Sequence, residues 1–258
     1  LLFGKLTGFI PNILCMILSL CLTLMGLNVL NMIFDLDLDR INKPNRPLPT
    51  NRISTPWAFG LSAALISIGI LISGLIHIYL ILVVATLILT FLIYTHPKVY
   101  FKKYLFSSPF FGGIFYGLIP ILATSIILPQ IDTTFSIIYI LMIVPIASLK
   151  DIEDIPGETI HGIKSIPQII GKQKTIKLAK FVLIFIIAIL FVLSVFNFYP
   201  ILFIIPILFA LAIIKKTFTA QQKEDYTTIT TQARLVTKAT LAINIIFLMF
   251  GITAFLII

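Results

Sequence analysis

Three polar residues, Asn31, Asp35 and Asp39, recur at four-residue intervals near the end of the first long apolar segment of the chain. In a continuing α-helix this spacing places all three side chains on one face. Magnesium prefers oxygen ligands and binds through a few carboxylates together with substrate phosphates. The pattern therefore predicts a magnesium site at the end of this helix. The alternative is a solvated helix end whose acids pair with the basic residues that follow.

A second acidic cluster ends the fifth apolar segment, with the sequence Lys150-Asp-Ile-Glu-Asp-Ile-Pro-Gly-Glu158. Asp151, Asp154 and Glu158 share one helical face if the helix persists, whereas the Pro-Gly pair would let Glu158 reach the cluster from a turn. Magnesium ions held by both clusters would neutralise a diphosphate that neither could approach alone, because like charges repel. Acids at a membrane boundary are functional candidates, so we expect both clusters to serve one reaction.

The elements that position these clusters are predicted to be membrane helices. Of the 258 residues, 59% are hydrophobic and 11% are charged, a composition that excludes an ordinary soluble domain. Uncharged runs such as Phe181–Phe196 lack the alternation of barrel strands. Cys15 and Cys21 lie in one apolar segment, so a disulfide framework is not expected.

At about 20 apolar residues per span, the sequence predicts an all-α integral membrane protein with eight helices. The predicted spans cover residues 9–35, 56–75, 77–95, 108–128, 133–150, 175–197, 199–215 and 235–257. We expect a single transmembrane domain over residues 1–258, made of two four-helix halves at about 9–128 and 133–258, each with one acidic cluster.

Basic residues mark one side of the predicted bundle. Of the 19 Lys and Arg residues, all except Lys5 lie in or beside the connections 36–55, 96–107, 151–174 and 216–234. The positive-inside rule therefore predicts a multi-pass protein of the cell membrane with both acidic clusters on the cytoplasmic side. This placement also explains the net charge of +9 without a nucleic-acid partner. No signal peptide is visible, and Leu1–Gly8 resembles the tail of a preceding helix.

Two long motifs resemble those of the UbiA superfamily of intramembrane prenyltransferases. The first is Asn31-x3-Asp35-x3-Asp39, followed by Asn42-Lys-Pro-Asn-Arg-Pro-Leu-Pro49 and Arg52-Ile-Ser. The second is Lys150-Asp-x2-Asp-x2-Gly-Glu158, followed by Gly162-Ile-Lys-Ser-Ile-Pro167. The resemblance covers nearly the whole chain and implies a UbiA-type bundle of nine helices. Because the family places its first motif after the second helix, most of the first helix is expected to be missing from this sequence.

The resemblance implies magnesium-dependent transfer of a prenyl group from its diphosphate to a lipophilic acceptor within the membrane. The sequence itself indicates no obligate protein partner. The magnesium ligands that it implies are Asn31, Asp35, Asp154 and Glu158. The catalytic acids that it implies are Asp35, Asp154, Asp39 and Asp151. The bases expected to contact diphosphate oxygens, each equally well explained by membrane orientation, are Arg46, Lys98, Lys150 and Lys164. The chain departs from the family at Glu158, where Asp is usual, and at Ile146, where many members carry Tyr.

The acceptor is the least defined part of the hypothesis. The segments Arg46-Pro-Leu-Pro, Arg52-Ile-Ser and Lys-Asp-Ile-Glu-Asp are most similar to archaeal members that prenylate geranylgeranylglyceryl phosphate for membrane lipids. This favours a geranylgeranyl donor and that acceptor. An aromatic quinone precursor or a chlorophyll-type acceptor is the alternative. A cation transporter is disfavoured because the acids lie in or near loops, and an inactive prenyl-lipid-binding paralogue stays open because of Glu158.

Overall fold

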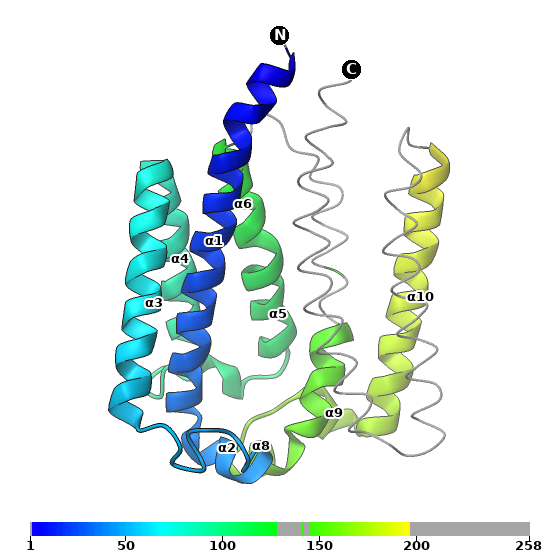
Figure 1. Cartoon of the computed structure of the whole chain (residues 1–258). Helices are drawn as coiled ribbons and strands as arrows, with labels where there is room; N and C mark the ends of the chain where they lie inside the picture. The colour runs from blue at the N-terminus through cyan, green and yellow to red at the C-terminus, as the bar shows by residue number, and fades with distance from the viewer. Residues whose placement is uncertain (1, 128–140, 142–144, 197–258) are drawn as a thin grey trace. The chain divides into compact units, whose positions relative to one another are not determined.

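The computed structural model describes residues 2–127, 141 and 145–196, which form helices and turns without a strand (Figure 1). The elements in chain order are α1 (Leu2–Phe34), α2 (Leu36–Asn42), α3 (Thr55–Ile76), α4 (Ile78–Thr95), η1 (Phe101–Lys103), α5 (Ser107–Gly113), η2 (Ile114–Leu118), α6 (Ile119–Ile127), η3 (Asp151–Glu153), α8 (Ile155–Ile160), α9 (Ile166–Ile170) and α10 (Lys172–Phe196). Here η2 is a π-helical turn, and η1 and η3 are 3₁₀ turns.

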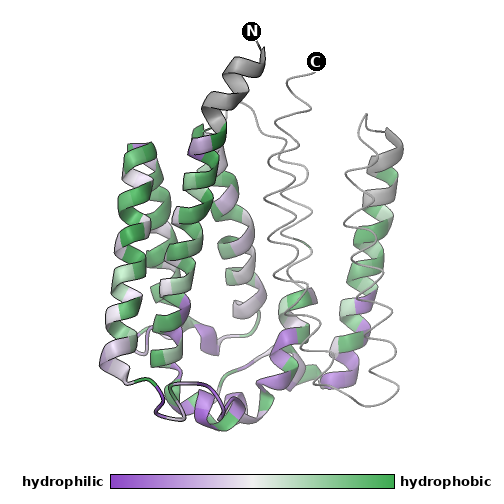
Figure 2. Ribbon diagram, viewed as in Figure 1, coloured by the Kyte–Doolittle hydropathy of each residue, from purple (hydrophilic) through white to green (hydrophobic). Residues whose placement is uncertain are grey.

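The described residues belong to two compact units. The first contains residues 2–102 and 118–127, and the second contains residues 103–117, 141 and 145–196. The first acidic cluster lies in the first unit and the second cluster in the second unit. In each unit, hydrophilic residues gather at the ends of apolar helices (Figure 2).

Among the described residues, four helical segments are long and apolar enough to cross a membrane. They are Ile10–Phe34, Thr55–Ile76, Ile78–Thr95 and Ser107–Ile127. These segments agree with the first four predicted spans, and the expected all-α membrane fold is confirmed. Helix α10 coincides with the sixth predicted span. The fifth span lies largely outside the described residues, and the seventh and eighth lie entirely outside them.

A single residue, His77, connects α3 to α4. Its extended backbone (φ −161°, ψ 137°) both ends α3 and precedes α4, and its amide donates to the Ser73 carbonyl at 3.1 Å. The His77 Nδ1 atom accepts a hydrogen bond from the Tyr79 amide at 3.3 Å, which satisfies one free donor of the α4 N-terminus. The two helices therefore form a hairpin without a spare connecting segment.

Small residues bring α1 and α3 into close contact. Ser19 Oγ donates to the Gly69 carbonyl at 2.6 Å, and Ser62 Oγ donates to the Gly26 carbonyl at 2.8 Å. Each helix thus supplies one serine donor and one glycine acceptor to the other. Because lipid offers helices little hydrophobic reason to associate, such close backbone approach and interhelical hydrogen bonding hold the pair together.

We expect Gly69→Ala to destabilise the α1–α3 pair by about 1–3 kcal/mol. A Cβ atom at Gly69 would lie 2.2 Å from Thr23 Oγ1 and 2.9 Å from the Ser19 carbonyl oxygen, so the helices must separate. The matched control is Gly60→Ala on the same helix, where a Cβ atom would meet nothing within 4 Å. Thermal unfolding of the two variants in detergent measures the difference. Equal midpoints would contradict the close-packing explanation.

Candidate active site

The first acidic cluster is built at the junction of α1 and α2. Helix α1 ends at Phe34, Asp35 occupies a turn (φ −94°, ψ 16°), and α2 begins at Leu36. The helical hydrogen-bond register nevertheless continues across the turn, since the Asp35 amide donates to the Asn31 carbonyl at 2.8 Å and the Asp39 amide to the Asp35 carbonyl at 2.7 Å. The break is therefore small, and the three predicted ligands keep the spacing of a continuing helix.

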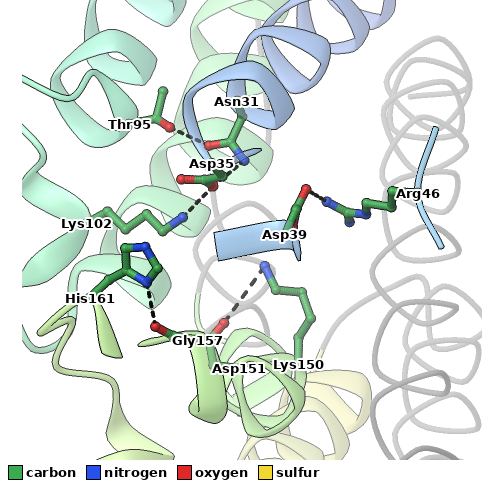
Figure 3. Close-up of polar contacts among 10 residues, drawn as sticks. All are labelled: Asn31, Asp35, Asp39, Arg46, Thr95, Lys102, Lys150, Asp151, Gly157 and His161. Atoms are coloured by element: carbon green, nitrogen blue, oxygen red, sulfur yellow. Dashed lines mark hydrogen bonds and ion pairs between the residues drawn. The ribbon is translucent and has the colours of Figure 1, made fainter. Parts of the chain in front are cut away.

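A chain of polar contacts surrounds Asp35 (Figure 3). Thr95, the last residue of α4, donates its hydroxyl hydrogen to Asn31 Oδ1, and Asn31 Nδ2 donates to Asp35 Oδ2 at 2.8 Å. Lys102, in η1, also donates to Asp35 Oδ2 and forms an ion pair with it. The Asn31 amide is thereby oriented from both ends, and the Asp35 carboxylate is contacted from α1 and from η1.

The other carboxylates of this segment divide into a buried and an exposed group. Asp39 is buried and accepts a hydrogen bond from Arg46 at 2.5 Å. Asp37 is exposed and pairs with Arg40 at 2.7 Å across one helical turn. The description as a solvated helix end therefore suits Asp37 but not Asp35 or Asp39, because burying a carboxylate has a cost that a surface ion pair does not explain.

One observation, the state of the Asp35 carboxylate, indicates that the cluster suits a magnesium ion. Asp35 is only 4% exposed, and its Oδ1 atom is buried without a hydrogen-bond partner among the residues that the structure describes. A buried carboxylate oxygen normally has a partner, and a hard cation is a suitable one. Within the described part of the chain, no group of three His, Cys, Asp or Glu side chains lies close enough to hold a metal. The oxygen donors of Asn31 and Asp35 are of the kind that magnesium prefers.

The second cluster is arranged on η3 and α8. The Asp154 amide donates to the Asp151 carbonyl at 3.1 Å, and the Glu158 amide to the Asp154 carbonyl at 3.0 Å. Pro156 lies in the first turn of α8, where a missing amide hydrogen is tolerated. Glu158 is therefore on a short helix rather than on a turn. Asp151 is buried and Asp154 is partly buried.

Ser165 holds the carboxylate of Glu158. Its hydroxyl group donates to Glu158 Oε2 at 2.5 Å, and both residues are buried. The Ile163 amide also donates to the Glu158 carbonyl at 2.9 Å, which closes the loop between α8 and α9. One carboxylate oxygen of Glu158 is thus fixed by a short charge-assisted hydrogen bond.

The predicted diphosphate-binding bases lie in different surroundings. Arg46 contacts Asp39, and Lys150 Nζ lies 3.9 Å from Asp151 Oδ1 (Figure 3). Lys98 and Lys164 are exposed. The Lys164 amide donates to the Lys103 carbonyl at 3.0 Å, so the position of Lys164 is fixed by its backbone.

Sequence reasoning missed Thr95, Lys102 and Ser165. Lys102 is 67 residues from Asp35 in the sequence, and nothing in the spacing of Lys98, Lys102 and Lys103 distinguishes them. Of these lysines, the structure pairs Lys102 with Asp35, and Lys102 is the middle residue of the 3₁₀ turn Phe101–Lys103. The sequence indicated Thr95 and Ser165 only weakly. Thr95 is a polar residue at the end of a predicted span, and Ser165 is a polar residue shortly after the second acidic cluster.

Comparison with known proteins places the chain in a family. Residues 3–238 match the model of the UbiA prenyltransferase family. The chain belongs to this family. The resemblance stated from the two motifs is thereby confirmed.

Curated relatives of this UbiA family member include archaeal proteins named digeranylgeranylglyceryl phosphate synthase. The protein of Saccharolobus solfataricus is 30% identical over 171 residues, which are 62% of this chain and 57% of the relative. That of Methanothrix thermoacetophila is 34% identical over 171 residues, 62% of this chain and 59% of the relative. The chain therefore spans less than two thirds of the length of these relatives.

Solved structures show the same fold. The apo UbiA homologue of Aeropyrum pernix K1 has a TM-score of 0.70 at 17% identity and covers 91% of this chain and 90% of its own. The UbiA homologue of Archaeoglobus fulgidus bound to GPP and Mg²⁺ has a TM-score of 0.63 at 15% identity, covering 94% of each chain.

Proposed function

We propose that this chain catalyses magnesium-dependent transfer of a prenyl group, with geranylgeranyl as the donor group, from its diphosphate to a lipophilic acceptor. The observation that carries the proposal is the buried Asp35 carboxylate, whose Oδ1 atom has no hydrogen-bond partner, within a motif of the UbiA prenyltransferase family. Family homologues bound to DMAPP or GPP together with Mg²⁺ support this donor chemistry.

In the proposed reaction, the allylic C–O bond breaks and its electron pair leaves with the diphosphate. Magnesium, when bound, neutralises the charge of this leaving group. Asp35 and Asp39 would supply negative charge to hold the metal, and Asn31, whose amide is oriented by Thr95, would offer its side-chain oxygen. We expect Asp151, Asp154 and Glu158 to serve the same reaction, and Arg46, Lys98, Lys150 and Lys164 to be bases for phosphate oxygens. The acceptor hydroxyl then forms the new C–O bond and releases its proton.

The proposed acceptor is geranylgeranylglyceryl phosphate. The support comes from the names of the curated relatives at 30% and 34% identity. The test is purified protein in liposomes with geranylgeranyl diphosphate and magnesium, offered geranylgeranylglyceryl phosphate, 4-hydroxybenzoate or chlorophyllide in parallel. Release of diphosphate with a prenylated glyceryl phosphate product supports the proposal. A prenylated aromatic or chlorophyll product would reassign the acceptor, and no diphosphate release from any mixture would favour the inactive paralogue.

We also propose that the acidic clusters face the cytoplasm, because the long connections carry nearly all Lys and Arg residues. In a background with Cys15 and Cys21 replaced by Ala, we expect a membrane-impermeant maleimide to label His77→Cys in intact cells. Ser54→Cys, an exposed and uncharged position at the opposite end of α3, is expected to react only after permeabilisation. The reverse pattern would invert the assignment.

A further inference from the structure

One lysine occupies the place where the magnesium hypothesis needs a cation. Lys102 Nζ pairs with Asp35 Oδ2, and the side chains of Lys102 and Asp35 are only 12% and 4% exposed. The same carboxylate leaves its Oδ1 atom buried without a hydrogen-bond partner. Asp35 is thus paired on one oxygen by the protein itself, while its other oxygen has no hydrogen-bond partner within the described structure.

Two cations cannot both stay close to this carboxylate without a cost. A lysine ammonium and a divalent ion at one buried carboxylate repel each other, and the repulsion is strong because little water screens it. The Asp35–Lys102 ion pair must also be weakened before both carboxylate oxygens can serve a metal. Lys102 therefore competes with any metal that binds Asp35.

The segment that carries Lys102 is built to place it there. Lys102 is the middle residue of η1, a turn of three residues, and Tyr100 just before it has a positive φ of 45°. Such backbone is uncommon and strained for an aromatic residue, and it persists only where surrounding contacts hold it. The pairing of Lys102 with Asp35 is one such contact.

We propose that Lys102 is an exchangeable internal counter-ion, which neutralises Asp35 in the metal-free protein and leaves it when a divalent cation binds. This inference rests on the proposed function, because it assumes that Asp35 binds the metal. Two consequences are expected. Lys102 weakens metal binding in the absence of substrate, and metal binding increases the exposure of Lys102.

The first consequence is tested by titrating the full-length protein with Mn²⁺ and no diphosphate, with free Mn²⁺ followed by electron paramagnetic resonance. We expect Lys102→Met to bind Mn²⁺ on the order of tenfold more tightly than wild type, because no charge-assisted hydrogen bond must be displaced. Lys103→Met is the matched control, since it removes the same charge from the next residue along the chain. The Lys103 side chain is exposed and lies over the Tyr104 ring. Its affinity is expected to stay within about twofold of wild type.

The second consequence needs no variant and is independent of folding defects. Wild-type protein is treated with an amine-reactive ester with and without saturating Mg²⁺, and modification at each lysine is quantified by mass spectrometry. We expect the rate at Lys102 to rise about fivefold or more with Mg²⁺, because more Lys102 side chains leave Asp35 and become exposed to the reagent, while the rate at Lys103 stays constant.

The outcomes separate this inference from the proposed function. Tighter Mn²⁺ binding by Lys102→Met together with faster labelling of Lys102 in Mg²⁺ supports the exchange. Two results would overturn the exchange alone: metal binding that requires Asp35 but leaves Lys102 protected from labelling, and weaker Mn²⁺ binding by Lys102→Met. Either result would make Lys102 a residue that positions Asp35. A wild-type protein that binds no divalent cation without diphosphate overturns the exchange, whereas the absence of magnesium-dependent diphosphate release in the liposome assay overturns the proposed function separately.

Discussion

Asp35→Asn is expected to lower the rate of diphosphate release about 10³-fold or more, a loss of roughly 4 kcal/mol of transition-state stabilisation. The variant keeps the shape of the side chain but removes the charge that magnesium requires, and an amide is a poorer ligand than a carboxylate. The measurement is single-turnover diphosphate release from geranylgeranyl diphosphate at saturating magnesium. Asp35→Ala and Asp154→Ala are expected to lose turnover in the same way while remaining inserted in the membrane.

The control for this prediction lies two residues away. Asp37 has a side chain that is 77% exposed and pairs with Arg40 on the surface. Asp37→Asn removes the same charge from the first turn of α2 and is expected to keep the rate within about twofold, because surface ion pairs contribute little. Near wild-type rates for Asp35→Asn, or an equal loss for both variants, would remove Asp35 from the proposed metal site.

The second large effect is expected at Glu158, where the chain departs from the usual family residue. Glu158→Gln is expected to reduce turnover about 100-fold, because the buried carboxylate would lose its charge and its charge-assisted bond from Ser165 would weaken. Glu158→Asp shortens the side chain by one methylene and is expected to be milder, with a higher magnesium concentration needed for the half-maximal rate.

Ser165 and Glu153 complete this series. Ser165→Ala keeps the Glu158 charge but removes the donor that fixes Oε2, so its rate is expected to lie between wild type and Glu158→Gln. Glu153→Gln, an equal change of charge on the adjacent 3₁₀ turn, serves as the control. Magnesium titrations of diphosphate release compare all five proteins. If Glu158→Gln titrates like wild type, Glu158 has no part in metal binding.

The arrangement of Asn31, Asp35 and Asp39 could be predicted from the sequence because it depends on local backbone hydrogen bonding. The register from Asn31 to Asp39 survives the turn at Asp35, so four-residue spacing was sufficient. Spans such as Thr55–Ile76 could also be predicted, since their length and apolar composition follow from the thickness of the membrane.

The partners of these acids could not be predicted in the same way. Lys102 and Thr95 reach the cluster across 67 and 64 residues, and such contacts depend on how helices pack rather than on any periodicity. Ser165 was adjacent to a recognised motif, but its role depends on the loop between α8 and α9 that turns it toward Glu158. The shared use of magnesium by both acidic clusters stays a prediction.

The one-residue connection at His77 has a consequence for how the protein is assembled in the membrane. A single residue extends only about 3.5 Å, so neither α3 nor α4 can cross a bilayer while the other remains behind. The pair must enter as one helical hairpin, with the start of α3 and the end of α4 on the same side. Arg52 and Lys98 flank these two ends, so both positive charges favour the same orientation of the hairpin. Removing either charge alone weakens the signal for the whole hairpin, and only a change that outweighs both would turn the hairpin over.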